Sequence, residues 1–237
     1  MRLARMERIE RTAGGTARLR VIATLGAVLA LDSADKGMVG ATTTNLERAF
    51  SVGTTRIGLL LTVTSVVSVV ATVPFGMLVD RVRRVHLLAV VVVGWGLVML
   101  VGAAATTYTM LLVSRVLLGA AASVAYPAVA SLVGDWFPSA ERGRVLGLLL
   151  AGELVGTGVG LLVAGGAAIV VSWRLAFALV GAGALGVGWL LRGLPEPARG
   201  GASRMPAGQV QVPGLGAGGA TAVVTPGPAA DAPAEGG

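Results

Sequence analysis

The sequence predicts an all-α membrane protein with six transmembrane helices and a disordered C-terminal tail. Of its 237 residues, 54% are hydrophobic and 13% are charged, whereas an average soluble domain is about 25% charged. The hydrophobic residues gather in long runs, and roughly 20 consecutive apolar residues are enough to cross the hydrocarbon core of a bilayer as a helix. The chain is therefore expected to be an integral membrane protein.

The predicted spans follow one another with short connections, at residues 19–42, 57–78, 85–105, 110–133, 145–170 and 173–192. The first run follows an Arg-rich segment, as in a signal peptide. However, it has no small-residue cleavage site before the charged cluster Asp32–Lys36, and further spans follow. We therefore interpret it as a retained helix, so that residues 19–192 form one transmembrane domain.

The two ends of the chain differ from this domain in composition. Residues 1–18 contain five Arg and two Glu, which favours a solvated cytoplasmic segment over a short helix lying on the membrane surface. Residues 193–237 are dominated after Ala198 by Gly, Ala, Pro and Val, with no helical periodicity and no sustained apolar run. Such a composition predicts a disordered tail.

Charge in the connections predicts the orientation of the spans. The N-terminal segment, the 79–86 loop, the 134–144 loop and the C-terminal side are rich in Arg, whereas the alternate connections at 43–56, 104–109 and 171–174 carry less positive charge. Because Arg-rich connections stay on the cytoplasmic side, both termini are expected in the cytoplasm, and the protein in the plasma membrane.

Composition also excludes several kinds of site. The chain has no Cys and a single His, so disulfides, thiolate sites and multi-His metal sites are not expected, and no cofactor is predicted. No Gly-x-Ser-x-Gly motif accompanies His86, so an enzyme is not expected. The net charge of +7 reflects Arg beside the spans, where lipid and topology explain it better than nucleic acid.

A charged motif separates the second and third spans. It runs from Gly76 to Arg84 as Gly-Met-Leu-Val-Asp-Arg-Val-Arg-Arg. It resembles the corresponding loop of the major facilitator superfamily of secondary transporters, whose pattern is roughly Gly-x-Leu-Ala-Asp-Arg-x-Gly-Arg-Arg. Arg83 stands where that family usually has Gly. The matching residues are Gly76, Leu78, Asp80, Arg81 and Arg84.

Two further segments extend the resemblance over residues 19–192. Arg115-Val-Leu-Leu-Gly119 resembles the Arg-x-x-x-Gly of the family's fourth helix, and residues 135–144 resemble the loop that follows it. The resemblance implies an N-terminal six-helix half in which Arg84 pairs with Asp135 and Asp80 faces a helix of a second half. It further implies that the loop motifs gate conformational change without binding substrate, through Gly76, Asp80, Arg81, Arg84, Asp135, Glu141, Arg142 and Arg144.

Arg115 is the sharpest candidate for a functional site. Placing a charged side chain inside a span costs at least ~2.5–3.5 kcal/mol of free energy, so it needs an oppositely charged partner or a water-filled cavity. At about 1.5 Å per residue, Asp32 and Arg115 both lie roughly 20 Å from the cytoplasmic face. Asp35 and Lys36 lie within one turn of Asp32. Two interpretations stay open: a substrate- or proton-coupling cluster, and a purely structural ion pair near the outer rim.

Two further side chains complete the candidate site. Glu153 is expected roughly 12 Å deep in the fifth span, where a buried carboxylate can take up a proton or simply be hydrogen-bonded or face water. Tyr126, beside Pro127, either faces a cavity or packs in the core, and core packing is favoured. Gly152, Gly156 and Gly160 recur every fourth residue, which predicts close helix packing.

The family resemblance implies secondary active transport of a small solute by alternating access, proton- or ion-coupled, as in a symporter. Its substrate site lies between two six-helix halves. Three arrangements are open for this chain: a truncated or split gene product, which is favoured, a subunit that pairs with a second half, and a homodimer. The alternative function is a truncated, non-transporting membrane protein that acts as an interaction or assembly partner.

Overall fold

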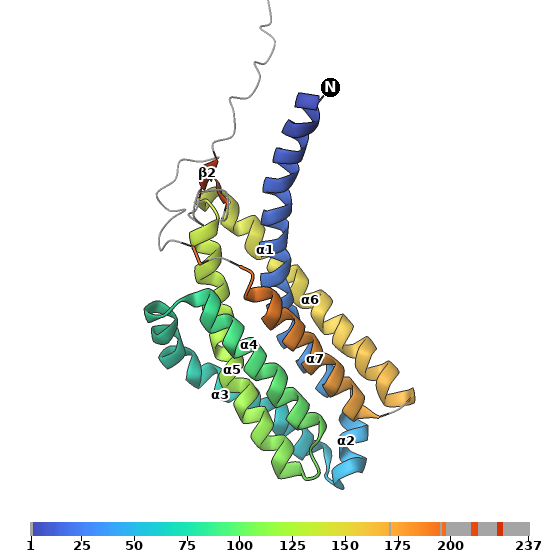
Figure 1. The fold of residues 1–237 in the computed structure, drawn as a ribbon. Coiled ribbons are helices and arrows are strands. Elements are labelled where there is room, and N and C mark those ends of the chain that lie inside the picture. Colours follow the sequence, from blue (N-terminus) through green and yellow to red (C-terminus); the bar gives the residue numbers. More distant parts are fainter. Residues whose placement is uncertain (1, 171, 195, 198–209, 213–221, 225–237) are drawn as a thin grey trace, which may run out of the picture.

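The protein is a bundle of long helices with a short helix at one end, as shown by a computed structural model (Figure 1). The structure describes residues 2–170, 172–194, 196–197, 210–212 and 222–224. In this part of the chain the helices are α1 (Arg2–Ala41), α2 (Thr43–Phe50), α3 (Thr54–Arg81), α4 (Arg84–Ala103), α5 (Tyr108–Trp136), α6 (Ser139–Val170) and α7 (Trp173–Leu191).

The six long helices correspond to the six predicted spans. Five of them, α3 to α7, are long and apolar enough to cross a membrane, with mean hydropathies from 1.7 to 2.4. Helix α1 is not among these five when only the described residues are considered, and Asp32, Asp35 and Lys36 lie within that part of it. It nevertheless packs along α6 inside the bundle, so its place depends on its neighbours as well as on its own hydrophobicity.

Helix α1 is longer than the predicted span. The N-terminal segment does not form a separate unit, because one helix continues from Arg2 to Ala41. Its first part projects beyond the bundle (Figure 1). No proline interrupts residues 2–18, and the Leu, Arg, Met, Glu and Ala that dominate them are good helix formers. The helix therefore continues through this segment, although the adjacent Gly14 and Gly15 are poor helix formers.

Helix α2 replaces part of a predicted loop at 43–56. It is amphipathic, with Leu46 fully buried, and the ring of Phe50 lies 5.6 Å from that of Trp173 on α7. It ends at Ser51, whose φ of 52° is left-handed and terminates the helix. Helix α2 thus caps the end of the bundle where α1 meets α3 (Figure 1).

The helices pack mainly in pairs, α1 with α6, α4 with α7 and α3 with α5, and α4 also contacts α5. Small residues make the α1–α6 contact close. A Cβ atom on Gly156 or Gly160 would overlap the backbone of Ala30 or Ala34, whereas one on Gly158 would meet nothing within 4 Å. The predicted packing role of this glycine series is thus confirmed at two of its positions.

The C-terminal tail is described only in part. Strands β1 (Val210–Val212) and β2 (Ala222–Val224) pair in antiparallel register, with Val210 opposite Val224. These short strands are not predicted by the sequence pattern, although their valines favour extended backbone. The other residues of the predicted disordered tail, apart from those at 193–194 and 196–197, lie outside the described residues.

Candidate functional site

Arg115 of α5 and Asp35 of α1 form an ion pair inside the bundle. Nη1 of Arg115 lies 2.7 and 2.9 Å from the two carboxylate oxygens of Asp35. The side chains are only 1% and 5% exposed. The guanidinium carbon also lies 5.0 Å from the ring centre of Phe177, and Nη2 lies 3.5 Å from Sδ of Met99. The predicted contact between Arg115 and a carboxylate of the first span is therefore present.

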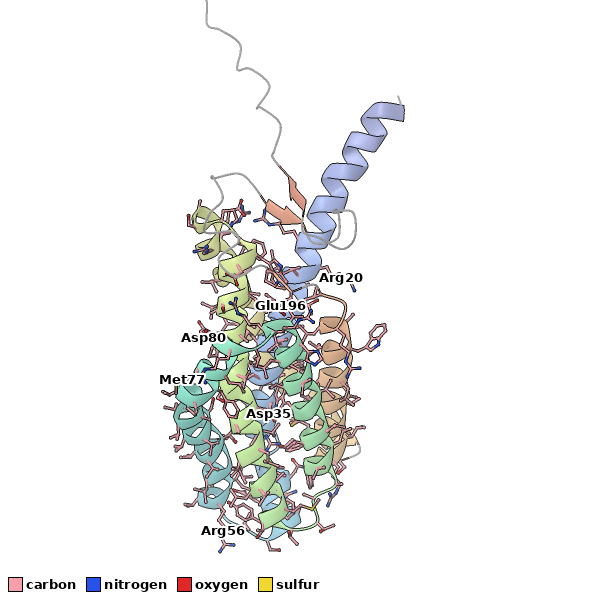
Figure 2. All side chains as sticks on the ribbon, turned by 60° about the vertical axis from the view of Figure 1, so that its left-hand side comes forward. Arg20, Asp35, Arg56, Met77, Asp80 and Glu196 are labelled. Atoms are coloured by element: carbon pink, nitrogen blue, oxygen red, sulfur yellow. The ribbon has the colours of Figure 1, made fainter. Side chains whose placement is uncertain are left out.

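The partner of Arg115 is Asp35, one turn further along α1 than the depth-matched Asp32. At the helical rise, Asp35 lies about 9 Å before the end of α1 and Arg115 about 10 Å after the start of α5. Both residues of the pair therefore lie about two helical turns inside that end of the bundle. Figure 2 shows it inside the bundle, between the end that carries Asp80 and Glu196 and the end that carries Arg56.

The buried pair leaves one donor without an acceptor, because Nε of Arg115 has no hydrogen-bond partner among the described residues. Taking two charges out of water costs free energy that their attraction only partly returns. Such a pair is weak evidence for stability and marks a candidate functional site in a membrane. Both interpretations of Arg115, coupling and structural, are compatible with this geometry.

A second ion pair lies beside the first and is more accessible. Nζ of Lys36 lies 2.6 Å from Oδ2 of Asp32, one turn away on α1, and their side chains are 51% and 22% exposed. Asp32 also lines a cavity of about 10 Å³ together with residues of α4 and α5, among them Trp95 and Ala125. A cavity of this size is close to the minimum that holds a water molecule.

Glu153 of α6 adds a third carboxylate to this region. It is partly buried, and it lies within electrostatic range of Asp32, as Asp35 does. Asp32, Asp35 and Glu153 carry three negative charges against the two positive charges of Lys36 and Arg115, which leaves a formal charge of −1. The group can therefore become neutral by taking up one proton.

Tyr126 does not belong to the core. Its side chain is 52% exposed on α5, so the favoured interpretation of core packing is wrong. The neighbouring Ala125 and Ala128 of α5 are buried instead. A role for Tyr126 in substrate contact stays a proposal.

The loop motifs meet at the basic end of the bundle, which we define as the end where α3 meets α4, α5 meets α6, and α7 ends. Arg84 forms a buried ion pair with Asp135, as the family resemblance implies. Arg142 donates hydrogen bonds of 3.0 and 2.7 Å to the carbonyl oxygens of Phe137 and Gly134. These contacts tie α4 to α5 and close the C-terminal turn of α5.

Of the other motif residues, Asp80, Arg81 and Arg144 are exposed, and Gly76 and Glu141 are partly buried. Among the described residues, Asp80 and Arg81 form no ion pair, and a Cβ atom on Gly76 would meet nothing within 4 Å. Glu141 is paired with Arg18 of α1, a contact that the sequence does not predict. Burial, assisted by the charge of the exposed Arg144, lowers the pKa of Arg18, which still stays cationic near neutral pH.

Glu196 lies at the basic end of the bundle, and the sequence pattern does not predict its role. Its two carboxylate oxygens accept hydrogen bonds from the backbone N–H groups of Arg84 and Val85, at 2.7 and 2.8 Å. Helix α4 has no side-chain cap of its own, so a residue more than a hundred positions away supplies it. Figure 2 shows Glu196 at the same end as Arg20 and Asp80.

No group of three or more His, Cys, Asp or Glu side chains suited to a metal ion occurs in the described part of the chain.

In a comparison with protein-family models, the model of the Major Facilitator Superfamily matches residues 25–228. A probable chloroplastic anion transporter 3 of Oryza sativa subsp. japonica is 33% identical over 147 residues, or 61% of this chain and 28% of that protein. A probable L-galactonate transporter of Escherichia coli (strain K12) is 25% identical over 66% of this chain and 35% of its own.

The fold is similar to that of a bacterial homolog of the human lysosomal transporter Spinster, in its inward-facing and unoccupied conformation. The TM-score is 0.71 at 22% identity, over 78% of this chain and 44% of that one. The occupied conformation gives a TM-score of 0.69 at 23% identity. This chain therefore spans about a third of the length of these curated relatives and less than half of the solved structures.

Proposed function

The chain belongs to the Major Facilitator Superfamily, and we propose that it moves a small organic anion across a membrane as one six-helix half of a transporter. The main observation behind this proposal is that two ion pairs lie side by side. The Arg115–Asp35 pair is buried, and the Lys36–Asp32 pair is accessible. The names of two relatives, which describe an anion transporter and an L-galactonate transporter, support an anionic substrate. Alternating access of two halves around a midplane site is the proposed mechanism.

Lys36 is the proposed substrate-binding cation. Arg115 is sealed against Asp35, so its charge is already matched and hidden. Lys36 is half exposed, and among the described residues its only ion-pair partner is Asp32 on its own helix. A substrate carboxylate can displace Asp32 from Lys36, because it offers the ammonium group the same kind of charge-assisted hydrogen bond.

Coupling to protons follows from the excess carboxylate. With a substrate anion on Lys36, the carboxylates of Asp32 and Glu153 lack a counter-charge, and a proton on Asp32 lowers that cost. In this scheme the proton and the anion enter together and leave together, which is symport. Tyr126 and Glu153 are proposed to contribute further polar contacts, whereas the Arg115–Asp35 pair holds α1 and α5 in register.

The site is completed by a second six-helix half. Only 17% of the apolar stretch of α3 and 22% of that of α6 are buried, the smallest shares among helices α3 to α7, so these two helices are the proposed contact surface for such a half. A second copy of this chain is the other candidate for that surface. The alternative function, a non-transporting assembly partner, predicts binding of a second half without flux.

The test uses proteoliposomes and L-galactonate as the probe. The chain is reconstituted alone and together with the C-terminal half of the Escherichia coli relative, with an inside-alkaline pH gradient. We expect no accumulation by the chain alone and saturable, gradient-driven uptake by the pair. Co-purification of the two halves without uptake of this or any other sugar acid would favour the assembly-partner function.

Matched variants test the assigned residues. Lys36→Gln should lower uptake at least about tenfold, because a charge-assisted hydrogen bond contributes about 1.5–3 kcal/mol, whereas Lys36→Arg should keep most of it. Glu153→Gln should reduce the stimulation by the pH gradient. The control, Arg56→Gln, removes an exposed charge that forms no ion pair among the described residues, and it should have no effect. Unchanged uptake by Lys36→Gln would refute the role of Lys36.

A further inference from the structure

A cavity opens at the basic end, away from the candidate transport site. Its volume is about 340 Å³, and it lies between the first turns of α4 and the segment that follows α7. One part of its lining is charged or polar and another part is apolar. The lining residues that matter here are Arg83, His86, Arg192 and Glu196 on the polar side, and Val90 and Leu194 on the apolar side.

The polar side of this cavity carries unmatched positive charge. Arg83 and Arg192 are exposed, and neither forms an ion pair with a described residue. The carboxylate of Glu196 is already engaged by two backbone N–H groups of α4. With His86 neutral, two positive charges and one negative charge leave +1. The adjacent Arg84, by contrast, is buried against Asp135.

The apolar side continues into the outer surface of α4. Val90, Leu97 and Val101 are 53%, 52% and 49% exposed, and their spacing of seven and four residues places them on one face of the helix. This stripe runs from the cavity past the centre of the predicted span 85–105. Trp189 is 72% exposed, two residues before the end of α7, and Trp side chains favour the membrane interface.

We propose that this cavity binds an anionic glycerophospholipid, with the phosphate held by Arg83, His86 and Arg192 and an acyl chain along Val90, Leu97 and Val101. A free anion would use the basic wall and leave the apolar stripe unused, so the two-sided lining favours a lipid. The bound headgroup bridges the start of α4 and the end of α7. It therefore stabilises the basic end of the bundle, beside the Arg84–Asp135 pair.

The test measures the thermal unfolding of the purified full chain in detergent by Trp fluorescence. Phosphatidylglycerol, at about 100 times its Kd, should raise the Tm by roughly 5–10 °C, and phosphatidylcholine should not. The double variant Arg83→Gln/Arg192→Gln should lose this rise. The double variant Arg48→Gln/Arg56→Gln, with the same charge change at the opposite end, should keep it.

Three results would overturn the assignment. An equal rise with phosphatidylcholine would show a general lipid effect, and an equal rise with inorganic phosphate or glycerol 3-phosphate would show a free-phosphate site. Loss of the rise in the Arg48/Arg56 control would show dependence on net charge alone. If the Arg83/Arg192 variant does not fold, photo-crosslinking of a diazirine-labelled phosphatidylglycerol to the natural chain decides: labelling should fall on peptides with His86 and Arg192, and labelling only elsewhere refutes the proposal.

Discussion

At the scale of single residues, the Arg115–Asp35 pair dominates the interior. Arg115→Met should destabilise the protein by about 3–5 kcal/mol, because it leaves the carboxylate of Asp35 buried without its counter-charge. Adding Asp35→Leu should recover a large part of this loss, since both buried charges are then gone. The measurement is the midpoint of denaturant unfolding in detergent, followed by Trp fluorescence.

Arg56→Gln serves as the control for this pair. Arg56 is exposed, and its guanidinium carbon lies 5.9 Å from the ring centre of Tyr108, so the substitution should cost less than about 1 kcal/mol. A single Arg115→Met substitution with as small an effect would mean that Arg115 and Asp35 find other partners. The double variant also separates the two interpretations of the pair, because a purely structural pair permits uptake after its removal.

The sequence predicts the existence of this contact but not its register. A charged side chain within an apolar run needs a partner, and the first span offers the acidic residues. Estimating depth by counting residues from the cytoplasmic face selects Asp32 as the partner of Arg115, because this estimate assumes that both spans begin at the same level. In the structure α1 starts far earlier and α5 ends later than the predicted spans. The Glu196 contact has no sequence signal, because its residues are more than a hundred positions apart.

At the scale of helices, the close α1–α6 contact depends on glycines, which have no side chain. Gly156→Leu should separate α1 from α6, since even a Cβ atom there overlaps the backbone of Ala30. Gly158→Leu is a matched control on the same helix, with open space around its Cβ position. We expect the Gly156 variant to lose several °C in Tm relative to the Gly158 variant. Equal values would show that the helices can move apart without cost.

The cap of α4 gives a second prediction at this scale. Glu196→Gln keeps one hydrogen-bond acceptor but removes the charge at the helix N-terminus, and it should cost about 0.5–2 kcal/mol. Hydrogen–deuterium exchange of the first turns of α4 should rise in parallel. Asp80→Asn, an exposed carboxylate at the same end without an ion pair among the described residues, should leave that exchange unchanged.

Whether the sequence predicts a helix depends on what stabilises that helix. The six long helices are visible in the sequence because the bilayer demands long apolar runs. Helix α2 is short, and its stability comes from Leu46 and Phe50 packing on other helices, which an isolated pattern of eight residues does not reveal. The continuation of α1 through residues 2–18 depends on helix propensity alone, which is a much weaker signal in the sequence than the apolar runs of the spans.

At the scale of the whole molecule, the alternation of charge predicts the orientation in the membrane. The chain has no Cys, so single cysteines at positions 83 and 107 report on opposite ends without further engineering. A membrane-impermeant thiol reagent added to intact cells should label position 107 and leave position 83 unlabelled until the cells are opened. Labelling of position 83 alone from outside would reverse the proposed orientation.

The sealed pair between α1 and α5 has a consequence for biosynthesis. Helix α1 leaves the ribosome first, and it carries Asp32, Asp35 and Lys36 within its predicted span. Its counter-charge, Arg115, is 80 positions downstream. At roughly 5–20 residues per second, α1 waits on the order of 4–16 s for that partner. During this interval the insertion machinery, and not the finished bundle, must shelter a carboxylate from the lipid.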